Sequence, residues 1–118
     1  MEGQNIYLPL DWDLREQTAR AAHLAVHRSQ PPWNDDVAAS CDARVERALA
    51  REVDAHALEL ETRHALGVVN TRYPFESQYF ATPLDRRRAW LGTYFLAHPD
   101  GDGAVPGFLS QYRARCQR

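Results

Sequence analysis

The sequence predicts an all-α fold, a small helical bundle of about four helices in a single domain, residues 1–118, organised around one long central helix. Residues 35–66 contain no Pro or Gly and are rich in Ala, Leu, Arg and Glu, which are strong helix formers. The polar run 34–36 is suited to a helix start and Gly67 to a helix end. Pro-rich and Gly-rich stretches separate the shorter elements.

The long element has one side suited to burial. The residues of this stripe advance in steps of three and four, and they are Val45, Leu49, Val53, His56 and Leu60. A single helix over this segment would span ~48 Å, whereas a compact domain of this length has a radius of gyration near ~13 Å. We therefore expect the helix to project, to bend, to pair with a second copy, or to be two helices broken near Ser40.

The shorter elements before the long helix are marked by caps and breakers. Residues 5–8 form an apolar run that suits an extended arm or a short edge strand. Asp11 or Asp13 is expected to cap a helix that runs to about Arg28, and Asp13 with Glu16 three residues later has the arrangement of a capping box. The pair Pro31-Pro32 ends that helix.

After the long helix, residues 68–82 show no helical period. We expect an extended connection there, with room for a short β segment near residues 68–81. Thr82 followed by Pro83 predicts the start of a further helix that ends before His98. A last helix is expected over about 106–116.

Composition excludes some partners. The net charge is -2, and all basic side chains are Arg, so general attraction to nucleic acid or to an anionic membrane is not expected. Ile, Val, Leu and Phe supply 24 of the 118 residues, which is a thin core that a partner or a homodimer would supplement. There is no secretory signal pattern and no long apolar run, so we expect a cytoplasmic protein with Cys41 and Cys116 as free thiols.

Histidine is the residue type that most suggests a metal site. His23 and His27 are four residues apart and share a helix face, and His56 and His64 are separated by about two turns. Glu61 and His64 have the Glu-x-x-His spacing of di-metal bundles, but the motif occurs once. The ordinary alternative is a core His56 with the other three on the surface. If a metal site exists, we expect His23, His27 and His56 to form it, with His64 as a further candidate.

The segment from Arg72 to Phe80, which we call the aromatic connector, is the main candidate for protein binding. Its aromatic residues follow Arg72 and either fold back onto the core or form an exposed patch with the composition of an interface. Leu58 is an apolar residue on the polar side of the long helix. The candidate interface residues are therefore Leu58, Arg72, Tyr73, Phe75, Tyr79 and Phe80.

Three other features of the sequence do not favour a specific function. The Asp-Gly-Asp-Gly loop at 100–103 lacks the acidic twelfth position of a calcium loop. Arg44, Arg47 and Arg51 share a helix face, which would suit nucleic acid better in a strongly basic domain. No catalytic set is present, so a non-enzymatic role is favoured.

The function that we expect from the sequence is a small protein–protein interaction module, an adaptor, inhibitor or regulator that self-associates, as a homodimer. The first alternative is a helical bundle that binds a divalent transition metal through its histidines, as a hydrolase or a metal sensor. The second is a nucleic-acid-associated regulator that uses its Arg faces.

Overall fold

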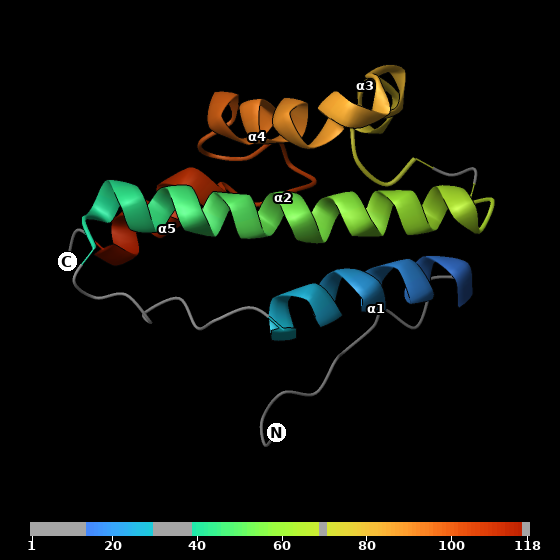
Figure 1. The fold of residues 1–118 in the computed structure, drawn as a ribbon, viewed down its shortest axis with the longest axis horizontal. Helices are drawn as coiled ribbons and strands as arrows, with labels where there is room; N and C mark the ends of the chain where they lie inside the picture. Colours follow the sequence, from blue (N-terminus) through green and yellow to red (C-terminus); the bar gives the residue numbers. More distant parts are fainter. Residues whose placement is uncertain (1–13, 30–38, 69–70, 117–118) are drawn as a thin grey trace.

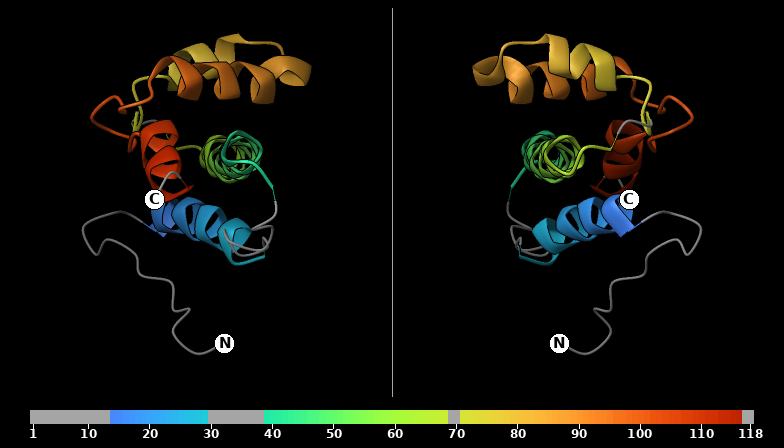
Figure 2. Two further views of the ribbon diagram at one scale, coloured as in Figure 1. Left: turned by 90° about the vertical axis from the view of Figure 1, so that its left-hand side faces the viewer. Right: turned by 90° about the vertical axis from the view of Figure 1, so that its right-hand side faces the viewer.

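The computed structural model describes residues 14–29, 39–68 and 71–116. In these ranges the fold is all-α, as predicted, with α2 (Cys41–Ala65) at the centre (Figure 1). Seen along α2, helix α1 (Leu14–Ser29) lies on one side and α3 (Glu76–Ala81) and α4 (Arg87–Ala97) on the opposite side (Figure 2). Helix α5 (Phe108–Cys116) lies beside α2, between these two sides. The long central helix is thus covered on three sides by the shorter ones.

Helix α2 begins at Cys41 rather than near residue 35. Ala39 and Ser40 are not helical, and the Ser40 hydroxyl accepts a hydrogen bond from the backbone N–H of Ala43 at 3.1 Å. The break near Ser40 is therefore confirmed, and a continuous helix over 35–66 is wrong. Residues 30–38 lie outside the described ranges. With 25 residues, α2 is about 37 Å long at ~1.5 Å per residue, a length that the neighbouring helices can cover.

The apolar core lies between α2 and the C-terminal half of the chain. Val45, Leu49 and Leu60 of the predicted stripe are buried there. Their partners come from α3, α4, α5 and the turn before α3, and include Phe75, Tyr79, Leu91, Phe95 and Phe108. Aromatic rings of these partners stack edge to face, as Phe95 and Phe108 do at 5.2 Å. A core poor in aliphatic residues is thus completed by aromatic ones.

The extended or β segment expected near residues 68–81 is wrong, because part of it is helix α3. The Glu76 carboxylate accepts hydrogen bonds from the backbone N–H groups of Arg72 at 2.7 Å and Tyr73 at 3.0 Å. This local capping fixes the turn, and Tyr79 then enters the core from the helix. Among the described residues there is no strand, and the one isolated bridge joins Gly101 and Pro106.

The helix expected to start at Thr82 starts later. Thr82 follows the last residue of α3, and its hydroxyl donates to the carbonyl of Gln78 within that helix, so it does not cap the next helix. A 3-10 turn, η1 (Leu84–Arg86), comes first and leads into α4, which ends before His98 as predicted. The first and last helices lie close to their predicted bounds. The arm at 5–8 and the Asp13 cap lie outside the described residues.

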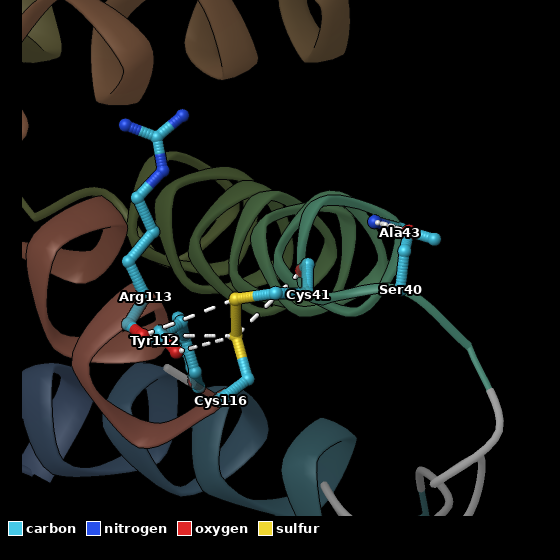
Figure 3. Close-up of a disulfide and its surroundings, with 6 residues drawn as sticks. All are labelled: Ser40, Cys41, Ala43, Tyr112, Arg113 and Cys116. Carbon is cyan, nitrogen blue, oxygen red and sulfur yellow. Dashed lines mark hydrogen bonds between the residues drawn. A yellow bond between two sulfur atoms is a disulfide. The ribbon is translucent and has the colours of Figure 1, made fainter. Parts of the chain in front are cut away.

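Cys41 and Cys116 form a disulfide, so the expectation of two free thiols is wrong (Figure 3). Their Cα atoms lie 5.4 Å apart although 75 positions separate them, because α5 runs back to the start of α2. Disulfides are typical of oxidising compartments, and the cytoplasmic location expected from the sequence remains a prediction. Within the described ranges, no helix has the length and apolar character needed to cross a bilayer.

Candidate functional site

Helices α1 and α2 meet along a row of buried polar side chains that we call the polar seam. Buried charged residues are rare unless they are paired. The two helices run antiparallel, so contacts near the start of α1 fall near the end of α2 (Figure 1). The buried members of the seam are Glu16 and His23 on α1 and Glu52, His56, Glu59 and Arg63 on α2.

At one end of the seam, Glu16 is held by two arginines. Its carboxylate accepts hydrogen bonds from Arg63 and Arg72, each at 3.0 Å. Burial alone would raise the pKa of Glu16, but these two guanidiniums outweigh it and the pKa is lowered. This end of the seam is therefore a charge-paired clamp that joins α1, α2 and the turn before α3.

In the middle of the seam, Glu59 is the most enclosed carboxylate. It accepts hydrogen bonds from Arg20 at 3.1 Å and from the hydroxyl of Tyr73 at 2.7 Å. Nδ1 of His23 lies 2.8 Å from the same carboxylate, but this contact is not a hydrogen bond. Burial would raise the pKa of Glu59, yet His23, Tyr73 and Arg20 together lower it to about 2. Glu59 is therefore a fixed anion that faces one edge of the His23 ring.

At the other end of the seam, three potential metal ligands converge. His23 and His27 from α1 and Glu52 from α2 each offer one donor atom, and the three atoms lie within 4.8 Å of one another. Nε2 of His27 is 3.2 Å from Oε2 of Glu52. The hydroxyl of Tyr112, on α5, donates to Oε1 of Glu52 at 2.8 Å. The two oxygens of Glu52 thus have different partners, and Oε2 is the one that faces the histidines.

The electrostatics of this end keep Glu52 ionised. Burial would raise the pKa of Glu52, but the contacts with His27 and Tyr112 reverse the effect and the pKa is lowered. An ionised carboxylate and neutral imidazoles are the forms in which these side chains bind metals.

His56 lies beside this set rather than in it. Its Nδ1 is 2.8 Å from the backbone carbonyl oxygen of Glu52 and 3.7 Å from Oε2 of that residue. The ring packs against those of His23, Phe95 and Phe108 at centroid distances of 4.3, 5.2 and 5.5 Å. Burial, and then the nearby His23, lower the pKa of His56 to about 4. His56 is therefore neutral near pH 7 and acts as a packed support for the donor set.

The donor set forms part of the wall of a pocket of about 660 Å³. Arg20 and Arg72 lie on the same wall, and Leu24 and Tyr73 continue it. The opposite side comes from residues 104–106 of the loop before α5, together with Phe108. This volume is in the range of sites that hold small molecules.

The structure brings together His23 and His27 of the predicted metal residues and leaves His64 out. His64 is exposed and stacks on Phe80 at 4.8 Å, near the far end of α2. Glu52 is not among the metal ligands expected from the sequence, because it flanks the apolar stripe. Its spacing of four from His56, which matches that of His23 and His27, is a signal that could have identified it.

The candidate interface residues have two different environments. Tyr73, Phe75 and Tyr79 are buried, with 5%, 2% and 1% exposure, so the aromatic connector folds back onto the core. Arg72 and Phe80 are half-buried, and Leu58 is 40% exposed. The six residues therefore do not form one continuous exposed patch in the single chain.

Comparisons with known proteins do not identify a family for this chain. No protein-family model, no curated protein and no solved structure matches this chain.

Proposed function

We propose that this protein binds one divalent transition metal ion through His23, His27 and Glu52. The observation that supports the proposal is the convergence of these three donors, from two helices, at the wall of an open pocket. Two imidazoles and a carboxylate suit Zn²⁺, and the same set is used for Fe²⁺. We take Zn²⁺ as the first choice.

The spacing of the donors suits such an ion. Bonds of about 2.0–2.1 Å to a tetrahedral ion place neighbouring ligand atoms roughly 3.3 Å apart. The 3.2 Å between Nε2 of His27 and Oε2 of Glu52 is close to that value. An ordinary hydrogen bond between these two atoms would have a similar length, so this distance alone does not distinguish a metal site from a hydrogen bond. The third donor, His23, is what favours a metal site.

Two further contacts support the ligands from behind. Metal-bound histidines commonly turn their second nitrogen to a carboxylate, which fixes the ring. Nδ1 of His23 lies 2.8 Å from Glu59 without forming a hydrogen bond, and a small turn of the ring would align the two and leave Nε2 for an ion. The hydroxyl of Tyr112 holds the second oxygen of Glu52 in a similar way.

Three protein ligands leave the fourth position of a tetrahedral ion open. Structural zinc sites are usually closed by four protein ligands, whereas sites that act on a substrate keep one position for water or substrate. Here that position would face the pocket. The proposed role is thus a metal-dependent one, in hydrolysis or in sensing.

Metal content tests the proposal. Protein purified without an affinity tag should contain about one equivalent of a transition metal by elemental analysis, or take up one equivalent of Zn²⁺ in a calorimetric titration. The variants His23→Ala, His27→Ala and Glu52→Ala should each weaken binding at least tenfold. His64→Ala is the matched control, because that ring lies outside the donor set, and it should bind like the parent.

Zinc binding that is absent, or that is equally strong in the His23→Ala/His27→Ala double variant, contradicts the proposal. The seam would then be a polar network that fixes the packing of α1 on α2.

A second candidate function is self-association, which an apolar groove between α2 and α4 favours. This groove of about 620 Å³ is lined by residues that include Val45, Leu49 and Leu96, and Leu96 is 55% exposed. Asp42 and Glu46 lie on its lining together with Arg113, and such mixed charge is self-complementary across a two-fold axis. A dimer in sedimentation equilibrium that Leu96→Glu dissociates would support it, and a monomer at all concentrations would exclude it.

A further inference from the structure

We infer that the pocket beside the donor set binds a small organic carboxylate, whose carboxylate group meets the metal ion and Arg20 and whose hydrocarbon part lies on the apolar wall. This inference rests on the proposed metal function. It adds the chemical class of the ligand at the open position.

The charges around the pocket favour a monoanion. Two arginines line it, and each is already paired with a carboxylate: Arg20 with Glu59 at 3.1 Å, and Arg72 with Glu16 at 3.0 Å. Arg63, the second partner of Glu16, also lies 3.5 Å from Glu76, so these ion pairs leave no net charge. A divalent ion bound with Glu52 therefore brings one positive charge in excess. A ligand with a single negative charge at the fourth position cancels it, as a metal-bound hydroxide would and a neutral water molecule would not.

Arg20 is placed to help orient such an anion. It forms part of the pocket wall together with His23 and Glu52. A guanidinium carries five N–H donors in a flat fork that matches a carboxylate, and its hydrogen bond to Glu59 is made from one terminal nitrogen. Because Glu59 also anchors the guanidinium, Arg20 can present a fixed edge to the ligand.

The rest of the wall suits a hydrocarbon body rather than a second charge. Leu24 of α1, residues 104–106 of the loop before α5, and Phe108 are apolar and line the same pocket. A volume of about 660 Å³ leaves room for several carbon atoms beyond a carboxylate. Inorganic phosphate or acetate would satisfy the charge but leave this surface uncovered, so they should bind more weakly.

Cobalt substitution separates this inference from the proposed function. Co²⁺ in place of Zn²⁺ gives visible absorption bands that respond to a new ligand. The Co²⁺-loaded protein would be titrated with hexanoate, acetate, inorganic phosphate and 1-hexanol. We expect saturable changes with hexanoate at concentrations at least tenfold below those needed for acetate or phosphate, and none with 1-hexanol.

Two variants test the two halves of the pocket. Arg20→Gln should weaken acetate and hexanoate by a similar factor of at least five, with Arg86→Gln, at an exposed position on η1, as the control. Leu24→Ala should weaken the binding of hexanoate and leave the binding of acetate unchanged. Each variant is compared at full cobalt loading, so a change in metal affinity is measured separately.

The orientation of bound hexanoate can be measured on the parent protein, without any variant. Paramagnetic Co²⁺ should broaden the proton signals of the hexanoate methylene next to the carboxylate more than those of its methyl group. If no protein-bound cobalt bands form, the proposed metal function fails. If the bands form but hexanoate has no effect, or binds no better than acetate or phosphate, the metal site stands and the carboxylate inference is overturned.

Discussion

At the scale of single residues, the polar seam is stable because each buried charge has an opposite charge or a donor against it. Glu59 has three such neighbours from α1 and from the turn before α3. Removing one member of a buried pair leaves the other without compensation, and this costs more than the pair contributes. The residues of the seam should therefore respond strongly to small changes in charge.

Glu59→Gln tests this directly. The substitution keeps the size of the side chain but leaves Arg20 without its anion, so the free energy of unfolding should fall by about 3 kcal/mol. Urea denaturation followed by circular dichroism measures the change. Glu46→Gln, on an exposed position of the same helix, should change the stability by less than about 0.5 kcal/mol. A similar small effect at Glu59 would mean that the seam carboxylate is solvated.

Glu16 gives a prediction for the dependence of stability on pH. Its folded-state pKa lies below the ordinary value of 4.5, so the unfolded chain binds its proton first as the pH falls. The contribution of Glu16 to stability should be complete above pH 4.5 and be lost as the pH drops below it. Glu16→Gln should flatten this part of the profile of unfolding free energy against pH. An unchanged profile would contradict the pairing with Arg63 and Arg72.

At the scale of elements, the loop between α4 and α5 forms one side of the pocket and depends on tight backbone contacts. Gly101 has φ +89° and bridges to Pro106. The Asp102 side chain accepts hydrogen bonds from the backbone N–H groups of Ala104 at 2.9 Å and Val105 at 2.8 Å. A Cβ at Gly101 would lie 2.6 Å from the carbonyl oxygen of Val105, so this position has no room for a side chain.

Gly101→Ala and Gly103→Ala form a matched pair. Both glycines have φ +89°, but an added Cβ at Gly103 meets no atom within 4 Å. Gly103→Ala should therefore cost only the left-handed conformation, about 1 kcal/mol. Gly101→Ala should cost more, about 2–3 kcal/mol, because backbone atoms must also move. Thermal unfolding compares the two, and equal losses would contradict the close contact at Gly101.

The sequence predicts the helices better than the turns and loops that connect them. Hydrophobic spacing and breakers located α1, α2, α4 and α5, because these signals are local. The turn before α3 was missed because it depends on the Glu76 side chain bonding to backbone groups three and four residues earlier. The shared face of His23 and His27 is visible in the sequence. The spacing of Glu52 relates it only to His56, and the packing of α1 on α2 brings it to the two histidines.

At the scale of the whole molecule, the disulfide closes a large loop. It joins the start of α2 to the end of α5 across 75 positions (Figure 3). Composition could not show this, because pairing of two distant cysteines depends on the fold that brings them together. The link also places α5, and with it Tyr112, next to Glu52.

Reduction should therefore destabilise the protein strongly. A loop of this length restricts the unfolded chain by roughly 4 kcal/mol, so the free energy of unfolding should fall by about that amount in the presence of a reductant. The double variant Cys41→Ser/Cys116→Ser should have the lower stability with or without reductant. A stability of the parent that does not respond to reductant would contradict the disulfide.

The central claim concerns an ion between two antiparallel helices, and anomalous X-ray scattering tests it most directly. Crystals of untagged protein grown with one equivalent of Zn²⁺ would be measured above and below the zinc absorption edge. We predict one strong difference peak within bonding distance of His23, His27 and Glu52. A map without a peak there, or with its main peak at His64 or His98, would contradict the account.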